Sequence, residues 1–295
     1  MKKIIAIVFI LLFSAAVVLA DEVEDTLAGV ANEQVMTATR QMIQNGIEQD
    51  DAIRLTRMMV QNQFSQRQTL QAQQMLIQAL QSGLPARPIM NKALEGMIKR
   101  IESGYILRAM DAVRERYTFA YQKAGQLTDK PKEMGVLGNL MADALTAGFE
   151  RRDMESIMTR LQEMARTMER KGIDALATEV CTTLRDMARL GVSSDAIAGV
   201  VSEALSQDYT AQKMEALRET FMNSAKKGSP EKIANSYASQ MRQGESPESP
   251  GSPGAGGDGS SGESGGVGSS GGSGSGSEGA SGAGAGSGGS GQSRK

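Results

Sequence analysis

The chain has 295 residues, with 32 Lys and Arg against 34 Asp and Glu, and it contains no histidine, one cysteine and no tryptophan. These counts exclude the Ser-His and Cys-His nucleophile systems, imidazole metal sites, internal disulfides and Cys-based zinc sites. The formal net charge of −2 also lacks the clustered basic surplus typical of nucleic-acid-binding proteins, so we expect no nucleic-acid partner.

Residues 1–20 have the three-part pattern of a secretory signal peptide. Lys2-Lys3 supply the positive start, residues 4–13 form the apolar core, and Val18 and Ala20 occupy the −3 and −1 positions. We predict cleavage after Ala20 and export to the periplasm or the extracellular space. An uncleaved N-terminal anchor is the alternative, but the apolar run is short for a bilayer-spanning helix, so we expect no stable span after cleavage.

A short acidic leader, residues 21–31, precedes a domain that we predict to be helical over residues 32–243. Glycines recur in this domain at intervals of about 20 residues, or about 40 where one is skipped. Glycine is favoured just past a helix C-terminus. We therefore expect a helix end at each of Gly46, Gly83, Gly104, Gly125, Gly148, Gly172, Gly191, Gly228 and Gly244.

Four of these glycines share one apolar register. The residues four before, three before and one after Gly46, Gly83, Gly148 and Gly191 are all apolar. This agreement indicates a repeated helical hairpin. The predicted fold is therefore all-α, with antiparallel hairpins stacked as a repeat-like bundle or an α-solenoid. The period and hairpin plan are similar to those of tetratricopeptide and HEAT arrays, but the tetratricopeptide Trp, Gly and Tyr signature is missing, so we infer membership of neither family.

Several polar residues have the positions of helix start signals. They are Asp50-Asp51, Asp153, Ser193-Ser194 and Ser229-Pro230. Ser and Asp accept hydrogen bonds from the free backbone N–H groups of a first turn, and Pro suits the first helical position. We interpret Asp50-Asp51 as a capping pair rather than as paired catalytic carboxylates.

Residues 244–295 are almost entirely Gly, Ser and Ala. Such a segment has too little apolar surface to offset the entropy of ordering, so we predict a disordered low-complexity tail. It is either a solubilising spacer or tether, or sequence without a specific role.

Methionine is unusually frequent, with 19 in the chain. Thioethers bind Cu(I) or Ag(I), which makes Met58-Met59 and the group Met154, Met158, Met164 and Met168 candidate soft-metal ligands. The alternative is that methionine fills the gaps of the core, or lines a partner-binding groove. Because the methionines occur throughout the domain, we favour the core.

Two further features each have two interpretations. Nine glutamines between Gln61 and Gln81 form either a polar contact surface or an uncharged solvent face, and we favour the solvent face. Cys181 is either a buried inert thiol or a site of intermolecular pairing, and we favour the buried thiol. Gly135 and Gly138 lack the preceding strand of a phosphate-binding loop, so we assign them no phosphate site.

The paired charges at three other places indicate no site. Arg151-Arg152 and Lys226-Lys227 have the pattern of solvated helix ends, and the acids from Glu22 to Asp25 belong to the leader. We therefore predict no catalytic, cofactor-binding or metal-binding residue. The favoured function is an exported, non-enzymatic module that binds or scaffolds a protein or peptide. The alternatives are a Met-based soft-metal or stress-related binding protein and a carboxylate-dependent hydrolase.

Overall fold

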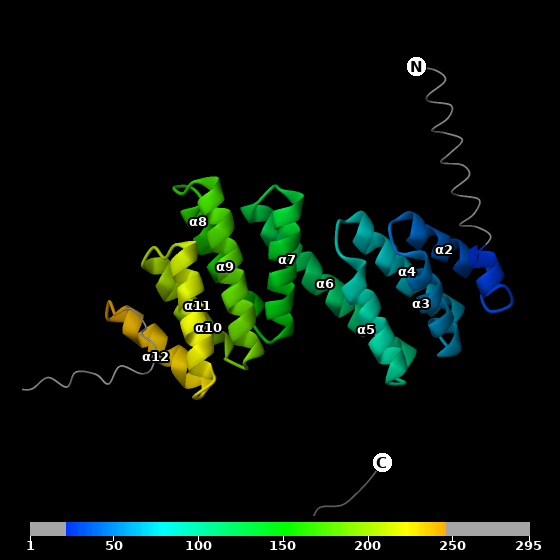
Figure 1. Ribbon diagram of the computed structural model, residues 1–295. Helices are drawn as coiled ribbons and strands as arrows, with labels where there is room; N and C mark the ends of the chain where they lie inside the picture. The colour runs from blue at the N-terminus through cyan, green and yellow to red at the C-terminus, as the bar shows by residue number, and fades with distance from the viewer. Residues whose placement is uncertain (1–21, 246–295) are drawn as a thin grey trace, which may run out of the picture. The chain divides into compact units, whose positions relative to one another are not determined.

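The structure is a computed structural model that describes residues 22–245, and within that range every regular element is a helix. The predictions for the signal peptide and for the tail beyond residue 245 lie outside the described residues. A short helical segment at residues 22–27 is followed by eleven longer helices (Figure 1). Their bounds are α2 Glu33–Gln44, α3 Gln49–Gln61, α4 Gln66–Gln81, α5 Ala86–Ile98, α6 Ser103–Leu127, α7 Pro131–Thr146, α8 Arg151–Met164, α9 Arg170–Arg189, α10 Ser194–Ser206, α11 Ala211–Ala225 and α12 Pro230–Arg242.

The acidic leader is part of the folded body. Residues 22–27 form a short helical segment, and its Val23 and Leu27 are fully buried beside Ile53. Glu24 also pairs with Arg40 of α2 at 3.2 Å. The packed domain therefore begins before residue 32, which is where the sequence predicted its start. The leader was not recognised as part of the domain because it has only one short apolar stripe.

The helices pair as hairpins and stack in two layers. The first layer holds the leading helix of each hairpin, α2, α4, α7, α9 and α11, and the second layer holds α3, α5, α8, α10 and α12. Within the layers α2 packs on α4, α3 on α5, α7 on α9, α9 on α11, α8 on α10 and α10 on α12. A single helix of this length cannot bury its apolar stripe alone, so each stripe is covered by neighbouring helices. In four of the five hairpins these include the hairpin partner, whereas α8 packs on α6, α9 and α10. The predicted all-α, stacked-hairpin fold is confirmed.

The 25-residue helix α6 interrupts this pattern between the second and third hairpins. It packs against α4 and α5 on one side and against α7 and α8 on the other (Figure 1). This insertion explains why Gly83 and Gly148 are separated by more than one repeat. It also corrects the prediction of helix ends at Gly104 and Gly125, which both lie within α6, and at Gly172, which lies within α9.

A glycine with positive φ lies at the internal turn of four of the five hairpins, but not at the turns that connect successive hairpins. Gly46, Gly83, Gly148 and Gly191 have φ between +74° and +109° at the turns inside hairpins. The turns after α3, α5 and α10 place a non-glycine residue at φ of +54° to +61° instead, namely Gln63, Arg100 and Asp208. Both kinds of turn have the same pair of backbone hydrogen bonds, as expected for a Schellman cap.

Two other glycines let α6 approach its neighbours closely. A Cβ on Gly96 of α5 would lie 2.7 Å from Ile106 Cγ1, and a Cβ on Gly138 of α7 would lie 2.4 Å from Tyr121 Cδ2. Both distances are far below ordinary van der Waals contact, so only glycine fits. Gly138 therefore has a packing role, consistent with its rejection as part of a phosphate-binding loop.

Replacing Gly138 with Ala is expected to lower the free energy of unfolding by about 1–3 kcal/mol, because the new methyl group overlaps the Tyr121 ring in a packed interface. Gly135→Ala is the matched control in the same helix. Its Cβ would lie 4.0 Å from the Tyr121 hydroxyl oxygen, so it is expected to be neutral or to stabilise by up to ~1 kcal/mol through helix propensity. Urea unfolding followed by circular dichroism measures both, and equal stability of the two variants would contradict this interpretation of Gly138.

Candidate functional site

Three surface hollows lie along the first-layer helices and α6. The first, of about 750 Å³, lies between α2 and α4. The second, of about 630 Å³, is bounded by the C-terminal end of α4 and its turn, by α6 and by the start of α7. The third, of about 370 Å³, is bounded by α7, α9 and α11. We call the surface that carries them the first-layer face.

Glutamine is the side chain that these hollows share. A glutamine amide both donates and accepts hydrogen bonds, which matches the alternating N–H and C=O groups of a peptide backbone. Seven glutamines line the three hollows, and they are Gln34, Gln41, Gln71, Gln74, Gln78, Gln122 and Gln212. The first-layer face is therefore a polar surface whose uncharged donors and acceptors come from helices far apart in sequence.

The charge of this face changes along the stack. The hollow between α2 and α4 has one acid and one base in its lining, Glu33 and Arg67. The third hollow has four carboxylates in its lining, Glu133, Asp174, Glu179 and Glu215. Two of the four are in ion pairs, Asp174 with Lys130 at 2.7 Å and Glu179 with Arg218 at 3.5 Å. The face is thus amide-rich over α2 and α4 and acidic over α7, α9 and α11.

The second hollow lies where α6 breaks the repeat. Tyr121 and Met134 give it an apolar wall, and Arg114 and Gln122 give it polar groups. The Tyr121 hydroxyl donates to Asn139 Oδ1 at 3.2 Å. Partial burial raises the pKa of Tyr121 above its usual value, so the hydroxyl stays a neutral donor across the physiological range.

A buried polar cluster fixes α2 relative to α4. Gln73 of α4 donates to Thr39 Oγ1 of α2 at 3.0 Å and to Thr56 Oγ1 of α3 at 3.1 Å, and the two threonine hydroxyls are themselves 3.0 Å apart. All three side chains are buried. Buried networks of this kind orient the elements that carry them. The cluster therefore positions the glutamines on either side of the first hollow.

The glutamine-rich stretch is thus only partly a solvent face. Most of its glutamines are exposed and Leu76 and Ile77 are buried, as the favoured interpretation requires. Gln73 is the exception, because it occupies a core position. Its side-chain nitrogen bonds to Thr39, which lies 34 residues earlier, while its buried side-chain oxygen has no hydrogen-bond partner among the described residues. No local sequence pattern reveals such a pairing.

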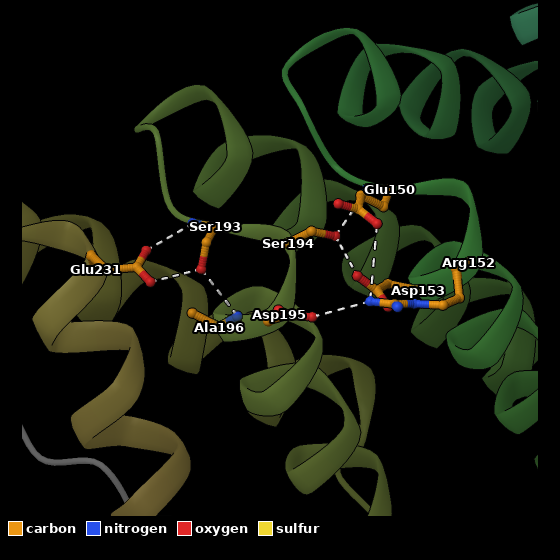
Figure 2. Close-up of polar contacts among 8 residues, drawn as sticks. All are labelled: Glu150, Arg152, Asp153, Ser193, Ser194, Asp195, Ala196 and Glu231. Carbon is orange, nitrogen blue, oxygen red and sulfur yellow. Dashed lines mark hydrogen bonds and ion pairs between the residues drawn. The ribbon is translucent and has the colours of Figure 1, made fainter.

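A ladder of polar contacts joins the N-termini of α8, α10 and α12 in the second layer (Figure 2). The Ser194 hydroxyl donates to Asp153 Oδ2 at 2.6 Å and accepts from the backbone N–H of Glu150 at 2.9 Å. On the other side of α10, the backbone N–H and the hydroxyl of Ser193 donate to the two carboxylate oxygens of Glu231, at 2.7 and 2.6 Å. These hydrogen bonds lower the pKa of Glu231.

This ladder has the chemistry of helix capping. Ser193 is the N-cap of α10 and its hydroxyl accepts from the N–H of Ala196, as the sequence predicted. Ser194 and Asp153 are buried, and the Ser194 hydroxyl is committed to two protein partners. The Ser194–Asp153 pair therefore joins α8 to α10 and has a structural role in the stack.

Ser194→Ala is expected to lower the free energy of unfolding by about 1–3 kcal/mol, because it leaves the Glu150 N–H and the Asp153 carboxylate without this hydroxyl in a buried place. Asp195→Ala is the control on the next residue. Asp195 is exposed and its pairing with Arg152 is screened by water, so the expected loss is less than ~1 kcal/mol. Thermal and urea unfolding compare the two, and the interpretation of the ladder fails if Asp195→Ala costs as much as Ser194→Ala.

The methionines lie in or against the core. Met154 and Met158 are at most 1% exposed within α8, and none of the methionines between residues 22 and 245 is exposed. They belong to the main apolar cluster or pack against it, apart from Met36, which belongs to the smaller cluster around the leader. The core-filling interpretation is confirmed for the described methionines, and no observation favours a thioether metal site.

The single thiol is also in the core. Cys181 is fully buried in α9, and burial raises its pKa to about 12. The favoured interpretation of a buried thiol is confirmed. Pairing with a second molecule would require this helix to leave its packed position.

Because the Cys181 thiol is buried and stays protonated, it is expected to react with a maleimide or a disulfide reagent only when the domain opens. The rate of labelling at pH 8 should rise steeply through the urea unfolding transition and be very slow below it. Mass spectrometry of quenched samples measures the labelled fraction. Rapid labelling in native buffer would show that the helix is open enough for intermolecular pairing.

The remaining charged candidates have structural roles. Asp50 and Asp51 lie in the first turn of α3, whose N-cap residue is Glu48 and whose N-terminus has no side-chain cap. The capping interpretation of this pair is therefore wrong in detail, since Asp51 instead pairs with Arg87 of α5 at 3.9 Å. The basic pairs at residues 151–152 and 226–227 lie at helix ends, as predicted.

Comparisons with known proteins add no assignment. No protein-family profile matches the sequence, and no curated protein matches it significantly. In the part of the chain that the structure describes, no helix combines the length and apolar character needed to cross a bilayer. Sequence reasoning did not single out the first-layer face, although the exposed glutamines of α2 and α4 were a signal for its first hollow.

Proposed function

We propose that this protein is an exported, non-enzymatic helical-repeat module that binds a protein or peptide segment along the first-layer face. One observation carries the proposal, namely that three hollows lined by seven glutamines lie along the first-layer helices and α6. Stacked hairpins present long surfaces of this kind to extended partners. Export rests on the signal-peptide pattern of residues 1–20.

The chemistry of the face defines the partner. A peptide that lies across α2 and α4 would exchange hydrogen bonds between its backbone and the amides of Gln71 and Gln74. Farther along, the carboxylates of Glu133 and Glu215 favour a basic side chain. The expected partner is therefore a polar, extended segment with at least one Lys or Arg.

Rigidity supports binding of this kind. The buried Thr39, Thr56 and Gln73 cluster holds α2, α3 and α4 in one arrangement. A surface that is already ordered loses less entropy when a partner binds. Neither the absence of histidine nor the capping role of the Ser194–Asp153 pair favours a hydrolytic function, which is why we propose a binding module.

The predicted mature chain, residues 21–295, is used to select binders from a displayed library of random peptides. We expect enrichment of peptides with Lys or Arg. Substituting both Gln71 and Gln74 with Ala should weaken the selected peptides about fivefold to tenfold, because hydrogen bonds to the backbone are lost. Substituting both Glu133 and Glu215 with Gln should weaken the basic peptides and reduce the salt dependence of their binding.

Asn91→Ala is the control, since Asn91 is exposed on the second-layer helix α5. Its dissociation constants, measured by calorimetry, should equal those of the unmodified chain. Selected peptides that bind all variants equally would place the binding site elsewhere, and failure to enrich any peptide would remove the support for a peptide-binding face.

A further inference from the structure

The turn between α5 and α6 exposes an unusual amount of apolar surface. Ile98, Ile101 and Tyr105 are 69%, 47% and 59% exposed. The five consecutive residues 98–102 are all exposed, so the whole turn is accessible to solvent. We call these three side chains the apolar corner.

Ile101 departs from the rule that governs the other turns. In a Schellman cap the residue after the left-handed position is apolar and packs back on the helix. The Ile101 N–H donates to Gly96 O at 3.0 Å, so the backbone of the motif is intact. Its side chain nevertheless stays exposed, whereas the equivalent apolar residues are buried at six other turns, namely Ile47, Phe64, Leu84, Phe149, Val192 and Tyr209.

The apolar corner has a local surplus of positive charge, although Lys99 is paired with Glu95 and Glu102 follows Ile101. Lys99 and Arg100 lie between the two isoleucines, and the Arg108 guanidinium lies 4.3 Å from the centre of the Tyr105 ring. Residues 92–108 contain four basic and two acidic side chains, while the whole chain has a net charge of −2. The corner therefore combines exposed aliphatic groups with a local positive surplus.

We propose that the apolar corner docks on the surface of an anionic lipid bilayer. Ile98 and Ile101 would enter the boundary of the acyl chains, and Arg100 and Arg108 would contact lipid phosphates. Tyr105 would lie at headgroup depth, where aromatic rings with a polar group are favoured. Apolar insertion and attraction to anionic lipids are the two terms that hold peripheral proteins on membranes.

The observations favour a bilayer over a protein partner. A stable protein interface buries about 800 Å² on each side and is depleted of lysine at its centre. The apolar corner is an exposed turn with three large apolar side chains and with cations between two of them. Lysine and arginine stems can extend along inserted aliphatic groups while their charged ends stay in water.

The test uses residues 21–295 and large unilamellar vesicles. One set contains phosphatidylcholine alone, and the other contains about 30% phosphatidylglycerol. Co-sedimentation should show binding to the anionic vesicles, weak binding to the neutral ones, and a loss of binding as salt screens the charges. Because the chain has no tryptophan, Tyr105→Trp provides a single probe whose emission should shift to the blue on the anionic vesicles.

Substituting both Ile98 and Ile101 with Ser should reduce partitioning by about tenfold or more, because two aliphatic side chains no longer insert. Arg100→Asn should reduce it by about fivefold, since one cation is lost. Asn is chosen because Arg100 has φ of +55°, a conformation that Asn tolerates. Leu190→Ser is the matched control, because Leu190 is an exposed apolar residue at another helix end, and its partitioning should be unchanged.

Circular dichroism verifies that each variant is folded. Equal partitioning of the Ile98 and Ile101 double variant and the unmodified chain would overturn the proposal, as would emission from the Tyr105→Trp variant that does not shift. If the chain binds no vesicles but binds another exported protein through this corner, the membrane proposal is also overturned, in favour of a protein partner. None of these measurements involves the first-layer face, so failure here is distinguishable from failure of the proposed function.

Discussion

Every helix of this protein depends on neighbours to cover its apolar stripe. Helices of 12 to 20 residues gain little stability by themselves, so the fold exists because each hairpin buries the stripe of the next. Methionine supplies much of the filling, which suits a chain with only 4% aromatic residues. The helix α6 is the one element that meets this requirement differently, since it covers the last helices of one stack and the first helices of the other.

The stacked hairpins could be predicted because their cause is local. Gly46, Gly83, Gly148 and Gly191 mark turns with positive φ, and the apolar residues around them follow the helical period. The turns at Gln63, Arg100 and Asp208 have no glycine to indicate them in the sequence, because a residue with a side chain adopts the same positive φ there. The length of α6 could not be predicted because two glycines that suggested helix ends, Gly104 and Gly125, lie within the helix.

The candidate site could not be predicted in the same way. Periodicity identifies which side of a helix faces inward, but it does not say which outward sides of different helices come together. The first hollow joins residues of α2 and α4, and the polar cluster beneath it joins Gln73 to threonines 17 and 34 residues away. These arrangements follow from the stacking of whole hairpins, and so they become visible only when the tertiary structure is known.

The close contacts of α6 also bear on how the protein unfolds. In a repeat array each unit is coupled only to its neighbours, so the two stacks would melt independently if nothing linked them. The Ile106 contact at Gly96 and the Tyr121 contact at Gly138 attach the same helix to both stacks. Neither stack can lose its inner hairpin without exposing the core side of α6. The packing of α6 on both stacks therefore favours one cooperative unfolding transition over two independent ones.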